Sequence, residues 1–391
     1  MFGFGYSVGD PNLPSGLATV RGPRYIPAVQ RTAPSNSYEI TGDKHMGPRI
    51  GIIGGGAIGG YTGGMLTKAG HDVTIVDQWP EHVAAVKANG LTIRHNDDEI
   101  NVPTNYININ ELQAIDDPFD YVFVAVKSYD TEWAAMLMRR YLKPEGAYVD
   151  FQNGINDYRL AETIGAENAL GCVITIAAGC YEPGIVLRTD TNPLAYKIGE
   201  QDGSDTPRAR ELVEVISSVS EGTYFTDNLW GERWAKLAIN CMVNPMAGIT
   251  GLTSDKVRTD PRVRDIRTQV GAEVIRVGRA LGHTIGDLLG VPAQMFVDAA
   301  EGRNIEDLEI EMDKQAANSG VTGRASFLQD VIKHRRTEIE FLNGFVSEQG
   351  RKTGVPTPFC DALVAVVREA GVGKLEPNPD NLAPVATLLQ N

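Results

Sequence analysis

Three polar side chains recur along one apolar stretch of the chain in a pattern that could form a binding site. Lys236, Asn240 and Asn244 are spaced i, i+4 and i+8 in a predicted helix over residues 230–249, so they lie within roughly 80° of one another on one face. Their neighbours are apolar: Leu237, Ile239, Met242 and Val243. A buried ammonium and two buried amides need partners, which either a ligand or neighbouring helices would supply. Pro245 is expected to bend or interrupt the helix just past Asn244.

A carboxylate falls on the apolar face of a second predicted helix, over residues 326–350. The apolar side chains of this helix all lie within about 60° of Phe327 on a helical wheel: they are Phe327, Val331, Phe341, Leu342 and Phe345. Glu338 lies inside that stripe, whereas Glu340 points away. Because an unpaired carboxylate on an apolar face is costly, we expect Glu338 to pair with Lys236. Such a pair is either a coupled catalytic pair or an ion pair that only holds two helices together.

A cofactor would be brought to these side chains by a glycine-rich stretch much earlier in the chain. The pattern Gly54-x-Gly56-x-x-Gly59 follows an apolar, β-like run and precedes a helix-like run. In such strand–turn–helix units the first glycine permits the turn, the second lets a pyrophosphate approach the backbone, and the third lets the helix pack closely. We therefore expect the loop residues Gly54, Gly56, Ala57, Ile58 and Gly59 to contact a dinucleotide. The pattern alone is weak, since glycine-rich turns are common.

The next predicted strand, residues 71–77, ends in an acid that strengthens the dinucleotide interpretation. Asp77 lies 18 positions beyond Gly59, close to the spacing at which an acid accepts hydrogen bonds from the adenosine ribose hydroxyls. A carboxylate there would repel a 2′-phosphate. The sequence therefore predicts that NAD(H) is preferred over NADP(H).

Two later strands are also followed by polar side chains. The apolar run 121–126 ends at Lys127, and the run 147–151 leads into Asn153. Ligands of open α/β sheets bind at the carboxyl ends of the strands, where the Asn153 amide could bind the ribose or nicotinamide side of the cofactor. The alternative is that Asn-Gly is only a turn signal.

The chain divides into three parts by composition and pattern. Residues 1–46 are rich in proline and are predicted to be an irregular extension. Residues 47–227 alternate between strand and helix, as in a Rossmann dinucleotide-binding domain, with later strands near 173–178, 185–188 and 195–198 that are expected to run antiparallel at the sheet's edge. Residues 228–391 carry helix signals only, which predicts an all-α domain. The fold class is therefore α/β, with the substrate site in the cleft between the two domains.

Net charge and composition limit the kinds of molecule that the protein is expected to bind. The net charge of −14 argues against nucleic acid and against an anionic membrane. The four cysteines and six histidines show no metal-ligand spacing, so we expect reduced, mostly buried thiols and no metal site. No apolar run is long enough to span a bilayer. The expected protein is cytoplasmic, acts on a small molecule, and could form a homodimer.

A family resemblance joins these motifs. The stretches IGIIGGGAIGG, KLAINCxxNPxA and SFLQDxxxxRRTEIExxNG, in this order, resemble the ketopantoate reductase (2-dehydropantoate 2-reductase) family over about residues 47–375. The resemblance implies a Rossmann domain, a helical domain, and hydride transfer between a nicotinamide and a 2-oxo acid. It implies that Lys236 and Glu338 are catalytic, that Asn240, Asn244 and Ser326 bind substrate, and that Lys127 and Asn153 contact the cofactor.

Three departures from the family leave the substrate open. Asp77 stands at the end of the second strand, where members that use NADP commonly have an arginine nearby. Gly323 stands three positions before Ser326, where the family typically has an asparagine. The stretch between Leu281 and Ser326 is longer than usual. These departures favour an NAD(H)-dependent enzyme for another 2-oxo or 2-hydroxy acid, or a related alcohol. The alternative is ketopantoate reductase itself, and a third hypothesis is a cofactor-sensing or scaffold protein without turnover. Retention of both Lys236 and Glu338 argues against the third.

Overall fold

The computed structural model describes residues 47–190, 196–318 and 324–390. The chain forms two units, Met1–Lys44 and His45–Asn391. The predicted N-terminal extension lies outside the described residues, and so does Gly323. The sheets, helices and site residues all belong to the second unit.

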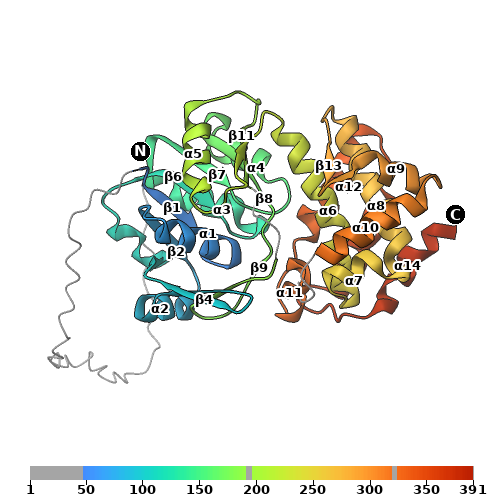
Figure 1. Ribbon diagram of the computed structural model, residues 1–391, viewed down its shortest axis with the longest axis horizontal. Helices are drawn as coiled ribbons and strands as arrows, with labels where there is room; N and C mark the ends of the chain where they lie inside the picture. The colour runs from blue at the N-terminus through green and yellow to red at the C-terminus, as the bar shows by residue number, and fades with distance from the viewer. Residues whose placement is uncertain (1–46, 191–195, 319–323, 391) are drawn as a thin grey trace, which may run out of the picture. The chain divides into compact units, whose positions relative to one another are not determined.

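An eight-stranded sheet forms the core of the N-terminal part of this unit (Figure 1), in the order β12-β11-β8-β7-β6-β1-β2-β5. Its strands are β1 Ile50–Ile53, β2 Val73–Asp77, β5 Asn105–Asn108, β6 Phe119–Val124, β7 Leu142–Asp150, β8 Ala169–Ile174, β11 Tyr196–Glu200 and β12 Tyr224–Phe225. The pairs from β5 through β8 are parallel, and β8 pairs with β11 antiparallel. The strand order reverses between β1 and β6, so the ligand-binding crevice of this fold lies at the carboxyl ends of these two strands.

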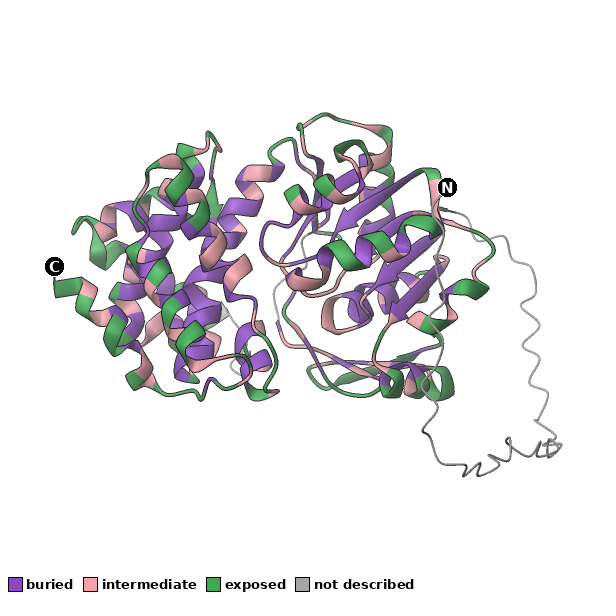
Figure 2. Cartoon of the chain, turned by 180° about the vertical axis from the view of Figure 1, so that it is seen from behind, coloured by how far each residue is buried: buried purple, intermediate pink, exposed green. Residues whose placement is uncertain are grey.

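The buried character of these strands explains why they form a parallel sheet. Every residue of β1 and the last five of β7 are buried, as the purple strands of Figure 2 show. Strands covered on both faces need continuous apolar runs. The accompanying helices are α1 Ala57–Lys68, α2 Pro80–Asn89, α3 Thr131–Met138, α4 Asp157–Ile164 and α5 Pro207–Ser217. The predicted Rossmann domain is confirmed.

A second sheet of four strands was not anticipated. It has the order β4-β3-β10-β9, with β3 Leu91–His95, β4 Asp98–Val102, β9 Ala178–Glu182 and β10 Ile185–Arg188. The strand predicted over 173–178 overlaps the end of β8 and the start of β9, and the strand predicted over 185–188 is β10. β9 and β10 belong to this second sheet, whereas the antiparallel strand of the first sheet is β11, near the predicted 195–198. Only pairing between segments far apart in the chain decides which sheet a short strand joins.

The C-terminal part is helical, as expected. Its helices are α6 Leu229–Thr250, α7 Ser254–Thr259, α8 Pro261–Ala280, α9 Ala293–Ala300, α10 Ile305–Asn318, α11 Ser326–Ile332, α12 Asn343–Thr353, α13 Pro358–Ala370 and α14 Ala383–Ala386. One small hairpin, β13 Asp287–Leu288 with β14 Val291–Pro292, interrupts this pattern. The long α6 packs against α8 and α11. Of the two effects expected of Pro245, a bend or an interruption, the interruption does not occur, since α6 continues five residues beyond it.

The predicted helix over residues 326–350 is also wrong, because the chain breaks into two helices there. After α11, the His334 N–H donates to the Val331 carbonyl and the Arg335 N–H to the Asp330 carbonyl, which is a Schellman motif. His334 takes the left-handed conformation (φ 51°) where glycine is usual, so no glycine signalled the stop. Glu338 consequently lies in the segment between α11 and α12, and His334 is exposed and not in the core.

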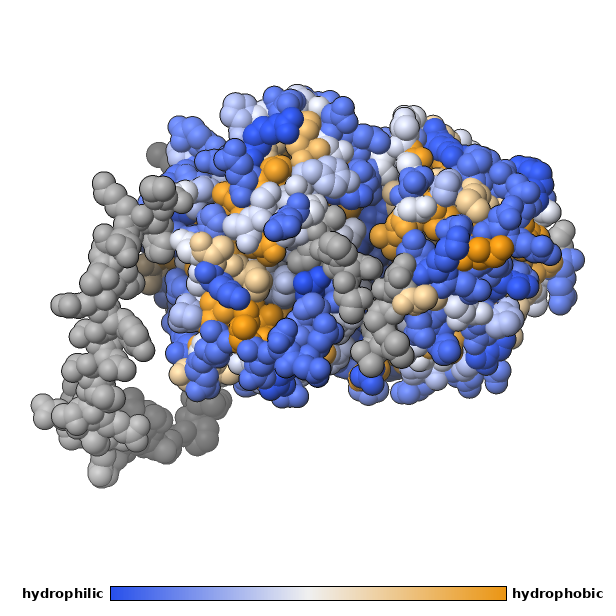
Figure 3. Space-filling model, viewed as in Figure 1, coloured by the Kyte–Doolittle hydropathy of each residue, from blue (hydrophilic) through white to orange (hydrophobic). Residues whose placement is uncertain are grey.

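The four cysteines are free and buried, in agreement with the expected thiols. Among the residues that the structure describes, no helix is both long and apolar enough to cross a membrane. The face drawn in Figure 3 is mainly hydrophilic, with smaller hydrophobic areas between charged ones.

Candidate active site

The glycine loop joins β1 to α1 with the geometry that the sequence predicts. Gly54 has φ +103°, and a Cβ there would come within 2.8 Å of the Ala125 carbonyl oxygen after β6. A Cβ at Gly59 would come within 2.0 Å of the Gly54 carbonyl oxygen, so helix and loop pack backbone to backbone. A Cβ at Gly56 would meet no atom within 4 Å, which leaves the loop open on that side.

The start of α1 fits a phosphate group. No side chain caps this helix end, and its first turn, with Ala57 and Ile58, carries no acid. Its first N–H groups and its dipole therefore favour an anion in the open space beside Gly56. The residues present thus fit the pyrophosphate of a dinucleotide.

Asp77 ends β2 beside this loop. Its carboxylate accepts a hydrogen bond from the Gly55 N–H at 2.6 Å and another from the Trp79 N–H at 2.8 Å. These two bonds fix the carboxylate at the end of β2, and each oxygen keeps a lone pair for a further donor.

Two side chains that the sequence did not single out hold the same loop. The Tyr106 hydroxyl donates to the Gly55 carbonyl oxygen at 3.0 Å. His82 accepts from the Gly184 N–H through Nδ1 at 2.9 Å, so its Nε2 carries the proton and donates to the Gly55 carbonyl oxygen at 3.1 Å. Burial lowers the pKa of His82, although Asp77 acts in the opposite direction. Neither residue belongs to a local motif, and only the tertiary fold brings them to Gly55.

Lys236 lies on α6. Within residues 47–190, 196–318 and 324–390, no side chain or backbone group forms a hydrogen bond or ion pair with its ammonium. Lys236 is half-buried and lines a cleft of ≈ 500 Å³ together with Val173 and Ile239. Burial, and then the positive charge of Lys197, lower the pKa of Lys236 to about 8. An ammonium with this pKa would act as a proton donor near neutral pH.

The two asparagines of α6 continue the polar stripe, and one of them meets the sheet. The Asn240 amide donates to the Asn153 side-chain oxygen at 3.4 Å. Asn244 is 7% exposed, and its amide has no hydrogen-bond partner among the described residues. An amide with no protein partner can bind a ligand, so Asn244 fits a position that a ligand completes.

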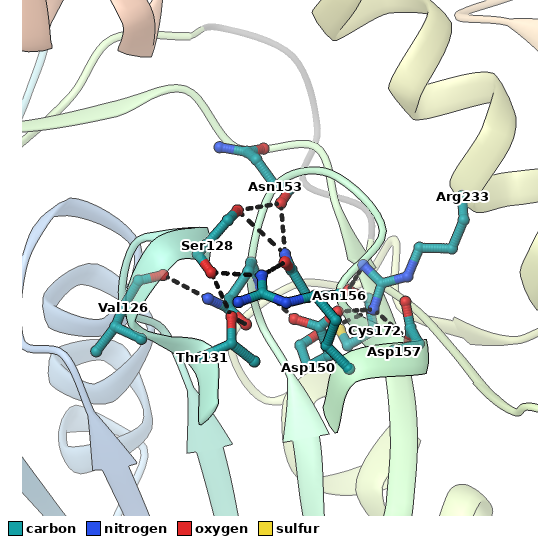
Figure 4. A network of polar contacts seen from close by, with 11 residues as sticks. Val126, Ser128, Thr131, Asp150, Asn153, Asn156, Asp157, Cys172 and Arg233 are labelled. Atoms are coloured by element: carbon teal, nitrogen blue, oxygen red, sulfur yellow. Dashed lines mark hydrogen bonds and ion pairs between the residues drawn. The ribbon is translucent and has the colours of Figure 1, made fainter. Parts of the chain in front are cut away.

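Asn153 follows β7 at the carboxyl edge of the sheet, as predicted. Its backbone carbonyl accepts hydrogen bonds from Ser128 and from the Asn156 amide, whereas its side chain points away from this network (Figure 4). The structure thereby joins the predicted cofactor contact Asn153 to the predicted substrate contact Asn240.

Glu338 does not pair with Lys236, and that expectation is wrong. Its Oε2 lies 3.1 Å from Nζ of Lys127, and its Oε1 accepts hydrogen bonds from the Ser128 N–H at 2.9 Å and the Ser128 hydroxyl at 2.8 Å. Burial would raise the pKa of Glu338, but Lys127 and Ser128 outweigh it and lower this pKa. Because helix 326–350 is broken, Glu338 reaches the edge of the sheet.

Lys127 also forms an ion pair with a second acid, which the sequence did not predict. Its Nζ lies 2.6 Å from Oδ2 of Asp330, which is buried on α11. Burial would lower the pKa of Lys127, but Glu338 and Asp330 together raise it above its usual range. Burial raises the pKa of Asp330 despite this ammonium. Lys127, predicted to contact the cofactor, is thus held between two acids from the helical part.

Ser326, the third predicted substrate contact, begins α11 and is half-buried. Its hydroxyl has no hydrogen-bond partner in the parts of the chain that the structure describes, so it joins none of the networks around Lys127, Asn153 and Glu338. In the same parts of the chain, no cluster of histidine, cysteine and acidic side chains has the arrangement of a metal site.

Arg233, one turn before Lys236, anchors α6 to the sheet. Its fully buried guanidinium forms ion pairs with Asp150 at 3.0 Å and Asp157 at 2.9 Å, and donates to the Cys172 carbonyl oxygen (Figure 4). Asp150 is the last residue of β7, so this network fixes the helix that carries Lys236 relative to the strand that precedes Asn153. No local pattern singles out Arg233, because Glu232 and Lys236 are also charged on the same part of α6.

Comparisons with known proteins agree with this architecture. Two models of one family match: "Ketopantoate reductase PanE/ApbA" over residues 50–203 and "Ketopantoate reductase PanE/ApbA C terminal" over residues 228–371. A 2-dehydropantoate 2-reductase of Mesorhizobium japonicum is 26% identical over 349 residues, which cover 83% of this chain and 98% of the relative.

Solved structures show the same fold. A PanE/ApbA family ketopantoate reductase from Ralstonia eutropha is 26% identical with a TM-score of 0.67, covering 82% of this chain and 97% of its own. D-mandelate dehydrogenase, solved with NADH and anilino(oxo)acetate, is 22% identical with a TM-score of 0.70, covering 86% of this chain and 99% of its own. The chain therefore belongs to the ketopantoate reductase family, and the prediction of an oxidoreductase that acts on CH–OH groups is confirmed.

Proposed function

We propose that the protein transfers a hydride between NAD(H) and a 2-oxo or 2-hydroxy acid, with Lys236 as the proton donor and acceptor. The observation that carries the proposal is the ammonium of Lys236. It lines a cleft, has no partner among the described residues, and has a pKa of about 8. On the same helix face, Asn240 contacts Asn153 and Asn244 is buried without a partner, so both amides are available to orient a ligand.

Each of the site residues has a separate task in this proposal. A bound nicotinamide would supply or accept the hydride at the 2-carbon. Lys236 would hydrogen-bond the substrate carbonyl oxygen and give it a proton as negative charge develops there. Asn240, Asn244 and Ser326 would orient the substrate, while Glu338 would hold Lys127 and Ser128 at the edge of the sheet.

Asp77 supports the preference for NAD(H). Its carboxylate is fixed by the N–H groups of Gly55 and Trp79 and still has lone pairs for the two ribose hydroxyls. A 2′-phosphate would bring like charge to the same place. D-mandelate dehydrogenase, a protein of the same fold, was solved with NADH.

The second candidate is ketopantoate reductase itself. It is favoured by the relatives, since the similar proteins include several 2-dehydropantoate 2-reductases.

Under either candidate we propose a cytoplasmic homodimer. Light scattering of the purified protein measures the oligomeric state.

A panel of 2-oxo acids that includes 2-dehydropantoate, assayed with NADH and NADPH by nicotinamide absorbance, tests the proposal. We expect turnover of at least one 2-oxo acid with a higher kcat/KM for NADH. Turnover confined to 2-dehydropantoate would favour the second candidate. Absence of turnover with every acid and both cofactors would refute both.

A further inference from the structure

The small hairpin between α8 and α9 carries an unusual backbone conformation. Its two tip residues, Leu289 and Gly290, both have positive φ (54° and 87°), as a type I′ hairpin turn requires. Asparagine is the usual choice at the first of these positions. In the described part of the chain, the other non-glycine residues with positive φ are Asn96, Asn304 and His334, types that tolerate this conformation. Leu289 is the aliphatic exception.

The tip is held in place from the neighbouring helix. Gln315 of α10 donates a hydrogen bond to the Leu289 carbonyl oxygen. Both the hairpin and α10 lie between Leu281 and Ser326, the stretch that the sequence predicts to be longer than usual for the family. This stretch therefore builds the hairpin and also supports its tip.

Leu289 lines the cleft that contains Lys236. It is 43% exposed, and the cleft it borders also contains Ile239 of α6 and Val173 of β8. Lys197 and Glu232 of the cleft wall form an ion pair with 2.5 Å between Nζ and Oε2, and Asp287 of the hairpin also lines the cleft. A large aliphatic side chain is thus kept, at a backbone cost, in the same cleft as the ammonium proposed to bind the substrate carbonyl.

We propose that Leu289 is a specificity-determining residue that contacts an apolar side chain of the substrate. The inference rests on the proposed function and specifies its substrate class as 2-oxo acids with a bulky apolar side chain. The carbonyl oxygen lies at Lys236, and the side chain extends along the cleft toward the hairpin. A volume of ≈ 500 Å³ accommodates an aryl or branched side chain.

The substitution Leu289→Asn separates substrate recognition from folding. Asparagine suits the left-handed conformation, so the variant should melt at or above the temperature of the unchanged protein. It removes the apolar contact, so the ratio of kcat/KM for phenylglyoxylate to kcat/KM for pyruvate should fall about ten-fold. Leu289→Met keeps an apolar side chain with the same backbone cost, and its ratio should stay within about two-fold.

The outcomes distinguish the inference from the function on which it rests. An unchanged ratio in a Leu289→Asn variant that is active and folded overturns the role of Leu289 and leaves the proposed function standing. If the unchanged protein reduces neither acid nor any other 2-oxo acid with either cofactor, the proposed function fails and this inference fails with it.

Discussion

Replacing Lys236 with methionine should make the protein more stable while abolishing its turnover. Methionine keeps much of the length of the lysine stem and removes the ammonium. Because the described protein offers this ammonium no partner, its removal breaks no hydrogen bond or ion pair. The burial that lowers the pKa of Lys236 to about 8 is a cost to the folded state.

The size and sign of the effect follow from that pKa. An ordinary lysine has a pKa of 10.5, against about 8 in the folded protein, and each pH unit of difference corresponds to about 1.4 kcal/mol. Below pH 8 both states hold the proton and the folded state carries the full cost, on the order of 3 kcal/mol. Between pH 8 and 10.5 the unfolded chain binds more protons, so the stability of the unchanged protein rises with pH. Above pH 10.5 the cost is absent.

Urea unfolding followed by tryptophan fluorescence measures this cost, since Trp230 and Trp234 lie on α6 in the turns before Lys236. The advantage of Lys236→Met should be largest at pH 7 and should shrink as the pH approaches 10.5. Lys374→Met, at an exposed lysine, should show neither effect. A Lys236→Met variant that is less stable than the unchanged protein at pH 7 would show that the ammonium has a stabilising partner, and the reasoning would be wrong.

Three other substitutions test the surroundings of the site. Lys197→Met removes a positive charge that lowers the pKa of Lys236. The alkaline limb of the pH profile of kcat/KM for reduction should therefore move to higher pH from about pH 8. An alkaline limb that does not move would mean that a group other than Lys236 titrates there. Asp77→Asn should lower the ratio of kcat/KM for NADH to that for NADPH at least ten-fold, and an unchanged ratio would exclude charge as the cause of any preference. Arg233→Met leaves Asp150 and Asp157 buried without their cation, so urea unfolding should show a loss of about 3–5 kcal/mol, and a loss below 1 kcal/mol would contradict the assigned role.

Local patterns were sufficient for the elements whose signals lie within one segment. The glycine loop was predicted from the spacing of its glycines after an apolar run. The strands that lead to Asp77, Lys127 and Asn153 were predicted because each is a continuous apolar run followed by polar residues. The stripe of Lys236, Asn240 and Asn244 was predicted because one helix carries all three. Within a continuous helix, residues spaced i and i+4 lie on the same face regardless of what the helix packs against.

Predictions failed where the outcome depended on partners far apart in the chain. Glu338 was placed on a continuous helix, but His334 ends that helix without the glycine or asparagine that usually signals a stop. The strands near residues 178 and 185 had the right residue types, but their sheet was decided by pairing with β3. His82 and Tyr106 share Gly55 as a target, and no spacing in the sequence connects them.

The break at His334 changes how charge is distributed across the site. Had Glu338 paired with Lys236, the ammonium would have been neutralised by its neighbour and its pKa would have been raised. Instead, Glu338 contacts Lys127 and Ser128, and the Lys236 ammonium has no hydrogen-bond or ion-pair partner among the described residues. Under the proposed function, this ammonium would attract an anionic 2-oxo acid and would give a proton to the carbonyl oxygen as that oxygen gains charge. A Lys236 paired with Glu338 would do both less well, because a neighbouring carboxylate repels an anion and raises the pKa of the ammonium.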